Sequence, residues 1–375
     1  MAEAATGLAG RGHEVELFTT CAKSHVSWAN ELPAGSFEDR GVLVRRFPTL
    51  RARSRLRAAE LERRVQRGER LSTRDELAWV NGRFRVPDLY LELVGRAREM
   101  DAIVLSPYLF WSTIYGARVA PERTVVMPCL HDEPYAWLGI VRSTLSAVAG
   151  AWFLSEPEHE LAHRVAPSLA PLHDVVGAAV EEPASYDPTG FRRRHGLERP
   201  FVLYAGRREE GKGWPGLLEA FAAASSRHDL PFDLVTVGDW PAGVPDALAG
   251  RVVDLGRLDA WELPDAFAAA EALVHPSVNE SFSRTVMEAW LAGRPVVVNA
   301  RSAVLTWHVE RSGGGLTYVD DRELGECLAF LAEAPKAAAA LAERGRRYVL
   351  ANYRWDRVLD SMERSLETLR SQRAT

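Results

Sequence analysis

The chain has 375 residues, of which 47% are hydrophobic and 26% are charged, and its net charge is −5. This length predicts two domains of about 150 to 200 residues, and the composition excludes a chain of disordered tails. Cys21, Cys129 and Cys327 lie far apart and lack metal-ligand spacing. No apolar run reaches the ~18 residues of a membrane span, and no secretory signal opens the sequence. We therefore expect a cytoplasmic protein, soluble or peripheral at the inner face of a membrane.

The first predicted elements are a helix at residues 2–10, a glycine-rich turn and a strand, in the opening stretch MAEAATGLAGRGHEVELFTT. Short apolar runs then alternate with helical stretches, and this alternation is typical of a parallel sheet wrapped by helices. The strands predicted in this half of the chain are residues 14–20, 42–47, 102–106, 124–128, 151–155 and 174–177.

Positive charge is concentrated between Arg45 and Arg74, where eleven arginines stand against three glutamates, a net charge of +8. Such a segment can bind an anionic membrane surface or an anionic acceptor. The alternative is a solvated helix and loop, since Leu56, Leu61 and Val65 form only a weak apolar stripe. The sequence leaves both possibilities open, and it gives no sign of nucleic-acid binding.

A hinge is predicted at residues 181–200, where prolines and glycines interrupt the alternation. The pattern then restarts, with strands predicted at residues 201–206, 232–238, 252–256, 272–277, 295–299 and 316–319. A long amphipathic helix from about residue 354 closes the chain and could reach back across the first domain. We predict an α/β protein with two Rossmann-like, doubly wound domains, residues 1–180 and 181–352, followed by a helix at 353–375.

The loop after the strand at 201–206 carries two cations, Arg207 and Lys212, among three glycines, Gly206, Gly211 and Gly213. Ligands of doubly wound sheets bind beyond the carboxyl ends of the strands, and glycines let the backbone approach a ligand closely. A guanidinium and an ammonium at this place suit a diphosphate. Two solvated surface cations are the alternative interpretation.

The stretch NESFSRTVMEAWLAGRPVV, residues 279–297, places Glu280 and Glu288 around the start of a predicted helix. If the helix begins within Ser281 to Ser283, its free N–H groups face the same strand ends. Glu288 then lies about 7 Å along the helix, roughly the offset from a nucleotide's phosphates to its ribose hydroxyls. Glu280 lies beyond the phosphates, where an attached sugar would be. The alternative is a helix cap at Glu280 and a solvated Glu288.

These residues resemble a known family. GRREEGKG is similar to the G-R-x4-K-G loop, and ESFSRTVME to the E-x7-E motif, of the retaining glycosyltransferases of family 4, which have the GT-B fold of two Rossmann-like domains facing a central cleft. LAGRGHEVELFTT, HPSVNESF and YRWDRV also match, in the family's order, so the resemblance covers essentially the whole chain.

The resemblance implies a nucleotide-sugar site in the second domain. Arg207 and Lys212 would bind the donor diphosphate, Glu280 the hydroxyls of the transferred sugar, and Glu288 the ribose. Further donor-binding positions are implied for the loop and helix residues Gly206, Ser281, Phe282 and Ser283. Glycine is commoner than serine in the family at positions 281 and 283, which predicts tighter contacts or a shifted donor.

Other implied contacts come from elsewhere in the chain. His131 stands after a strand, where the family usually has a histidine near the donor sugar and phosphate; a structural histidine is the alternative. Gly238 and the loop containing Leu258 would lie near the base through their backbone, so the base cannot be identified. The arginine-rich insertion at residues 49–100, with Trp79 and Tyr90, is expected to shape the acceptor side.

The implied reaction is a front-face transfer with retention, in which the leaving diphosphate departs and the acceptor hydroxyl attacks from the same side. We expect a saccharide, lipid-linked saccharide or small metabolite as acceptor, in polysaccharide, glycolipid or glycosylated-metabolite biosynthesis. No Asp-x-Asp triplet or zinc motif is present, so we expect no metal and no cofactor beyond the donor. A catalytically inactive homologue that binds a nucleotide sugar or a partner subunit is the alternative. A dehydrogenase is less well supported, because no Gly-x-Gly-x-x-Gly follows a strand.

Family members begin with a strand and a glycine-rich loop before the helix at residues 2–10. That strand lies centrally in a doubly wound sheet, and unpaired buried backbone costs about 1–3 kcal/mol per group. We therefore expect either a natural start some 20 to 30 residues upstream of Met1, or a weakened first domain with little activity.

Overall fold

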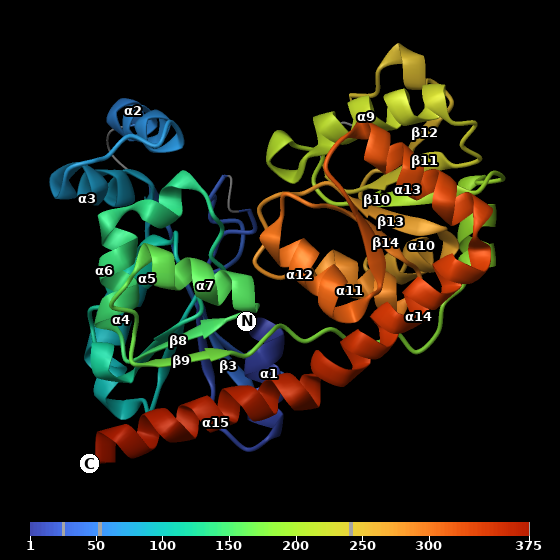
Figure 1. Cartoon of the computed structure of the whole chain (residues 1–375). Helices are drawn as coiled ribbons and strands as arrows, with labels where there is room; N and C mark the ends of the chain where they lie inside the picture. The colour runs from blue at the N-terminus through green and yellow to red at the C-terminus, as the bar shows by residue number, and fades with distance from the viewer. Residues whose placement is uncertain (25–26, 52–54, 240–242, 375) are drawn as a thin grey trace. The chain divides into compact units, whose positions relative to one another are not determined.

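The computed structural model describes residues 1–24, 27–51, 55–239 and 243–374. The chain divides into two compact units, Met1–Gly177 together with Val358–Thr375, and Ala178–Arg357. Each unit has its own buried core. The α/β fold class is the one predicted (Figure 1).

The described residues of the first unit form three separate sheets. One has the order β1-β3-β2, with β1 parallel and β2 antiparallel to the middle strand, and the second is parallel in the order β6-β7-β8-β9. A short antiparallel pair, β4-β5, is the third. Their bounds are β1 Glu16–Thr20, β2 Gly35–Asp39, β3 Val42–Phe47, β4 Leu50–Arg51, β5 Phe84–Arg85, β6 Ile103–Leu105, β7 Thr124–Val126, β8 Gly150–Phe153 and β9 Leu172–Val175. The expectation about residues upstream of Met1 stays a prediction.

Two helices of this unit have serine side-chain caps, and the closing helix is held by a side-chain hydrogen bond. Ser72 and Ser155 accept hydrogen bonds from backbone N–H groups in the first turns of α3 and α7, as helix N-termini require. The closing helix α15 is fastened to the unit by a hydrogen bond from Trp152 Nε1 to Ser365 Oγ at 2.8 Å. The helices are α1 Ala2–Gly10, α2 Arg55–Gln66, α3 Thr73–Gly82, α4 Pro87–Arg96, α5 Trp111–Gly116, α6 Gly139–Ala147, α7 Glu156–Val165 and α15 Trp355–Ala374, with 3-10 turns η1 Ala97–Glu99, η2 Pro121–Arg123 and η3 Pro134–Trp137.

The arginine-rich segment forms a strand end and helix α2, and residues 52–54 lie outside the described part. Leu61 and Val65 are buried, whereas Leu56 is 88% exposed, so the apolar stripe is narrow. Several arginines pair with carboxylates of this chain: Arg45 with Glu16 and Glu92, Arg57 with Asp75, Arg63 with Glu60, Arg64 with Glu69 and Asp75, and Arg67 with Glu69. Part of the positive charge is therefore balanced within the chain.

Trp79 belongs to the insertion that is predicted to shape the acceptor side, and that role of the insertion stays a prediction. The Trp79 ring is fully buried, and Nε1 donates to Glu62 Oε2 at 2.6 Å. Tyr90 packs edge-on against Trp111 and Tyr115. The insertion uses both aromatic residues in its own packing, because an indole buries more apolar area in a core than at a surface.

The second unit has one parallel sheet of six strands in the order β12-β11-β10-β13-β14-β15. The strands are β10 Phe201–Ala205, β11 Asp233–Val237, β12 Val252–Asp254, β13 Ala272–His275, β14 Val296–Asn299 and β15 Gly315–Tyr318. The central strands are buried along their whole length, which explains their largely apolar sequences. The strand order reverses between β10 and β13, so this is the topological switch point of the sheet.

Helices cover both faces of this sheet, with α9 and α13 on one side and α10, α11 and α12 on the other (Figure 1). Their bounds are α8 Pro188–His195, α9 Trp214–Arg227, α10 Leu263–Ala269, α11 Arg284–Leu291, α12 Ala303–Ser312, α13 Asp321–Glu333 and α14 Pro335–Asn352, with 3-10 turns η4 Glu210–Lys212 and η5 Asp246–Leu248. None of the helices, within the described residues, is long and apolar enough to cross a membrane.

Candidate nucleotide-sugar site

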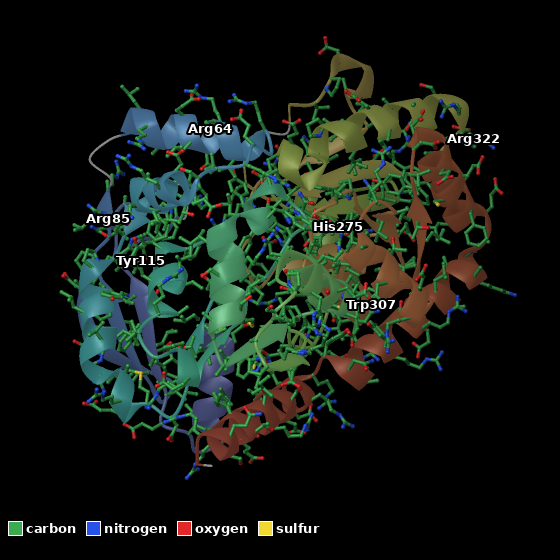
Figure 2. The ribbon with its side chains drawn as sticks, turned by 60° about the vertical axis from the view of Figure 1, so that its left-hand side comes forward. Arg64, Arg85, Tyr115, His275, Trp307 and Arg322 are labelled. Carbon is green, nitrogen blue, oxygen red and sulfur yellow. The ribbon has the colours of Figure 1, made fainter. Side chains whose placement is uncertain are left out.

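Three ionisable side chains meet at the switch point of the second unit. Lys212, in the loop after β10, places Nζ 2.7 Å from Glu280 Oε1. His275 ends the neighbouring strand β13 and places Nε2 3.2 Å from the same carboxylate oxygen; its position is labelled in Figure 2. The structure thus brings Lys212 and Glu280 together, as the proposed donor site requires, and adds a histidine.

Glu280 is nearly buried, with a side chain that is 10% exposed. Burial alone would raise its pKa, but the hydrogen bond and charge of His275 and the charge of Lys212 outweigh it, so the pKa of Glu280 is lowered below its usual range. Glu280 is therefore an ionised hydrogen-bond acceptor at neutral pH. The helix-cap alternative for Glu280 is wrong, because its carboxylate faces the loop after β10.

The loop from residue 206 to 213 is held against the chain beyond β13 by close backbone packing. Gly213 has φ +74°, and a Cβ there would lie 2.6 Å from the carbonyl oxygen of Pro276. Only glycine fits such an approach in that conformation without displacing the backbone. This packing fixes the preceding residue, Lys212, opposite Glu280.

Helix α11 begins later than predicted. Ser283 has φ +74° and is the N-cap, so the first helical residue is Arg284 and not one of the three residues from Ser281 to Ser283. A left-handed residue cannot continue a right-handed helix, and this conformation accounts for the preference for glycine at that position. Ser283 Oγ lies 3.2 Å from His275 Nε2, so the serine adds a polar contact to the site.

The two residues before Ser283 are also buried, Ser281 with 9% and Phe282 with 3% of its surface exposed. The Phe282 ring packs edge-on against Tyr353, with the ring centroids 4.8 Å apart. Phe282 therefore anchors the turn before α11, and a donor could reach this residue through its backbone alone.

Glu288 lies in the second turn of α11 and is half-buried. One of its carboxylate oxygens is 3.8 Å from Arg284 NH2, one helical turn earlier. The structure places both glutamates on the chain segment that leads from β13 into α11, and only Glu280 contacts Lys212. The ribose-binding role of Glu288 stays a prediction.

Arg207 follows β10 directly. Its guanidinium lies 3.0 Å from Glu209, within the same loop. The neighbouring Arg208, which the sequence analysis did not single out, is almost buried and lies 3.0 Å from Asp254 at the end of β12. A buried guanidinium beside a carboxylate is a structural feature that ties two strand ends together.

Glycines bring the other strand ends together. Gly206 N donates to Val237 O, and Gly238 N donates to Gly256 O at 2.7 Å. Gly238 has φ +145°, and a Cβ there would lie 1.9 Å from Gly206 O. Leu258 lies half-buried in the loop after β12. The predicted backbone contributors Gly206 and Gly238 are thus immediate neighbours.

His131 belongs to the first unit, in the loop after β7. Its Nδ1 lies 3.7 Å from Glu133, whose carboxylate also accepts a hydrogen bond from Tyr108 OH at 2.7 Å. The role of His131 at a donor stays a prediction.

The lowered pKa of Glu280 predicts how stability changes in acid. In the unfolded chain a glutamate has a pKa of about 4.3, above that of folded Glu280. The ionised carboxylate of Glu280 therefore contributes its full stabilisation of the folded state above about pH 5. This contribution is lost progressively as the pH falls towards the lower pKa of the folded protein. We expect the thermal midpoint of the wild type to fall more steeply between pH 5 and pH 3 than that of Glu280→Gln. Glu343→Gln, at an exposed helix position, is the control; equal slopes for all three proteins would contradict the assignment.

Residues 199–334 match the family of Glycosyl transferases group 1. Among relatives, the 2-deoxystreptamine glucosyltransferase of Streptomyces kanamyceticus is 35% identical over 138 residues, which are 33% of this chain and 35% of that protein. The D-inositol 3-phosphate glycosyltransferase of Salinispora arenicola is 30% identical over 189 residues, 46% of this chain and 42% of that protein. The chain thus spans less than half the length of these two relatives.

Solved structures match over nearly the whole chain. Sucrose-phosphate synthase from Thermosynechococcus elongatus superposes with a TM-score of 0.74 at 19% identity, covering 99% of this chain and 92% of that one. HepE of Anabaena in complex with UDP superposes with a TM-score of 0.69 at 16% identity, covering 94% and 100%. These neighbours are GT-B glycosyltransferases, and the chain has their fold.

Proposed function

We propose that this protein is a retaining glycosyltransferase that moves a sugar from a nucleotide-diphosphate sugar to a hydroxyl acceptor. The observation that carries the proposal is the contact of Lys212 and His275 with an ionised, nearly buried Glu280 at the switch point of a parallel sheet. Nucleotides bind at such switch points in doubly wound folds. The group 1 match over residues 199–334 supports the same activity.

In this proposal the cationic side chains bind the diphosphate, and the carboxylates bind hydroxyl groups of the donor. Lys212, Arg207 and the N-terminus of α11 oppose the negative charge that develops on the departing diphosphate, which is the largest contribution expected in such a site. Glu280 accepts hydrogen bonds from hydroxyls of the transferred sugar. Glu288 accepts those of the ribose. Gly213 and Gly238 already sit against neighbouring backbone, that of Pro276 and Gly206, and larger residues at these two positions would push the loops apart.

The reaction we propose needs no nucleophile from the protein. The bond between the anomeric carbon and the diphosphate oxygen breaks, and its electron pair leaves with the diphosphate. The acceptor oxygen then bonds to the same face of the anomeric carbon, and its proton passes to a phosphate oxygen. His131, in the first unit, is proposed to lie near the donor sugar.

The acceptor is a saccharide, a lipid-linked saccharide or a small hydroxylated metabolite. A peripheral contact of residues 45–74 with an anionic membrane at its inner face remains part of the proposal, with Arg46, Arg51, Arg70 and Arg74 among the cations of that segment. The names of the relatives, a 2-deoxystreptamine glucosyltransferase and an inositol phosphate glycosyltransferase, make cyclitols the first small acceptors to test.

The proposal is tested by incubating the protein with a panel of UDP-, GDP-, ADP- and dTDP-sugars, with and without acceptors. UDP-glucose comes first, because a structural neighbour was solved with UDP-glucose. We expect slow hydrolysis of one donor, faster transfer with an acceptor, and NMR couplings of a product with the donor's anomeric configuration. An inverted product would contradict the retaining mechanism. Saturable binding without turnover of any donor would favour the catalytically inactive alternative.

Substitutions of the two glutamates are expected to have different effects, one on nucleotide binding and the other on the rate of transfer. Glu288→Gln should weaken binding of free nucleoside diphosphate, because the ribose loses its charged acceptor. Glu280→Gln should leave that affinity nearly unchanged and lower kcat, because Glu280 contacts the sugar. Calorimetric titration and initial rates measure the two effects. Equal loss of nucleoside diphosphate binding in both variants would show that the two ends of the donor have been assigned wrongly.

Turnover is expected to persist in excess chelator. Fixed cations and a helix N-terminus already oppose the leaving charge, so a Lewis-acidic metal has no required role in the transfer. Rates are measured in excess EDTA and again after Mg²⁺ or Mn²⁺ is added beyond the amount that the chelator binds. Complete loss in EDTA, with recovery on adding either metal, would overturn this expectation.

A further inference from the structure

Three histidines of the first unit gather where helix α7 crosses strand β9. His159 and His163 stand one turn apart on α7, and His173 lies on β9 at the edge of its sheet (Figure 1). His159 Nε2 lies 3.0 Å from His173 Nδ1 and 3.1 Å from His163 Nε2. The three nitrogens all lie within 4.8 Å of one another.

Hydrogen bonding alone cannot satisfy this arrangement. A neutral imidazole has one N–H and one lone pair, and His159 Nε2 is the shared neighbour of two other ring nitrogens. If His159 Nε2 carries the proton, it can donate to one neighbour only. If it carries the lone pair, two donors compete for it. Protonating the rings adds donors, but it also adds repulsion between neighbouring cations.

A divalent transition metal resolves this conflict, because it bonds to all three lone pairs at once. Zinc binds imidazole nitrogens at about 2.0–2.1 Å in tetrahedral geometry, which puts two ligand nitrogens about 3.3 Å apart. The two short separations, 3.0 and 3.1 Å, are close to that value. His163 and His173 are exposed, so both rings can rotate to bring their nitrogens into tetrahedral positions around one ion.

A carboxylate supports the central ligand. Glu156 Oε2 lies 3.6 Å from His159 Nδ1, the nitrogen that faces away from the cluster. A carboxylate beside the outer nitrogen favours the tautomer with its proton there, which leaves the inner nitrogen free to bind a metal. The His159 ring also packs against Phe153, with the centroids 5.1 Å apart, so its orientation is fixed before any metal binds.

We propose that His159, His163 and His173 form a binding site for Zn²⁺ or a similar borderline divalent ion, with water as the fourth ligand. Three neutral imidazoles and an open position suit Zn²⁺, Cu²⁺, Ni²⁺ and Co²⁺ and exclude Mg²⁺ and Ca²⁺, which require oxygen ligands. The ion would join α7 to the edge strand β9 and so stabilise the first unit. This site shares no residue with the proposed sugar-transfer site.

The test is titration of the full chain, freed of metal by chelation and dialysis, with ZnCl₂ alone, followed by calorimetry and thermal unfolding. We expect one equivalent to bind and the thermal midpoint to rise with free Zn²⁺. His163→Gln and His173→Gln each remove one ligand and should weaken binding by roughly 100-fold, and Glu156→Gln by about 10-fold. With Co²⁺, visible absorption bands of a tetrahedral site should appear in the wild type and be lost in both histidine variants.

His13→Gln is the matched control, because His13 is an exposed histidine of the same unit outside the cluster. It should bind Zn²⁺ as the wild type does. Far-ultraviolet circular dichroism of the metal-free variants checks that each still folds. Equal Zn²⁺ affinity for the wild type, His163→Gln and His173→Gln would overturn the proposal, as would binding of several equivalents with no effect of either substitution. Neither outcome bears on sugar transfer, which is measured separately.

Discussion

Lys212→Ala is expected to lower kcat for sugar transfer by about 10² to 10³, the loss seen when one preorganised donor to a developing negative charge is removed. Lys212 is poised 2.7 Å from Glu280, and its ammonium is the charge best placed to meet the leaving diphosphate. The effect should appear in kcat more than in KM, because the charge on the leaving group is greatest in the transition state. Initial rates at saturating donor measure it.

The matched control is Lys336→Ala, which removes an exposed lysine of the same unit. Its rate should equal that of the wild type. Arg207→Ala should fall in the same range as Lys212→Ala if its guanidinium leaves Glu209 to bind the diphosphate. Wild-type turnover in the Arg207→Ala, Lys212→Ala double variant would show that the diphosphate lies elsewhere.

Gly238→Ala is expected to destabilise the protein by about 3 kcal/mol or more, because it combines a strained conformation with a backbone clash. The added Cβ would lie 1.9 Å from Gly206 O, so the loops after β10 and β11 would have to separate. A loss of that size corresponds to a thermal midpoint about 6 to 12 °C lower for a unit of this length. The variant should also lose donor binding, since the same two loops are expected to meet the nucleotide.

Gly250→Ala separates the clash from the strain. Gly250 has φ +78°, and nothing lies within 4 Å of a Cβ added there. That substitution should cost only the strain of a left-handed residue, about 1–2 kcal/mol. If the two alanine variants melt at the same temperature, the close contact between Gly238 and Gly206 does not contribute to the fold as described.

The strands of the second unit could be predicted because both faces of a parallel sheet are covered. Strand β10, residues 201–205, is an unbroken apolar run, and β11, residues 233–237, is largely apolar, with Asp233 and Thr236 buried among its apolar residues; a glycine follows each strand. Strand β2, Gly35–Asp39, was missed because all five of its residues are exposed. Such a strand carries no burial pattern, and only its pairing with β3 holds it in place.

The sequence singled out several residues of the candidate site, but it predicted few of the contacts between them. The resemblance to a known motif pointed to Lys212 and Glu280, yet their direct contact joins residues 68 positions apart and depends on which strands are neighbours. The late start of α11 depends on the positive φ of Ser283, which no propensity of serine predicts. His275 was missed as a site residue, although a polar residue that ends a buried strand is a usable signal.

The histidine cluster illustrates the same limit. His159 and His163 are one turn apart, a spacing that can be recognised once the helix is known. His173 joins them only because α7 packs over the neighbouring edge strand. Trp79 shows a related limit, since a tryptophan in a charged segment can still be a core residue when its Nε1 donates to a part-buried carboxylate, here that of Glu62.

The central claim is that the donor binds at the carboxyl ends of β10 and β13 in the second unit. Hydrogen exchange followed by mass spectrometry, with and without the nucleotide sugar that the panel identifies, tests this most directly. We predict slower exchange in peptides covering residues 205–214 and 275–288, and no such protection at the same donor concentration in the Lys212→Ala, Glu288→Gln double variant. Protection confined to other segments, or unchanged protection in the double variant, would contradict the claim.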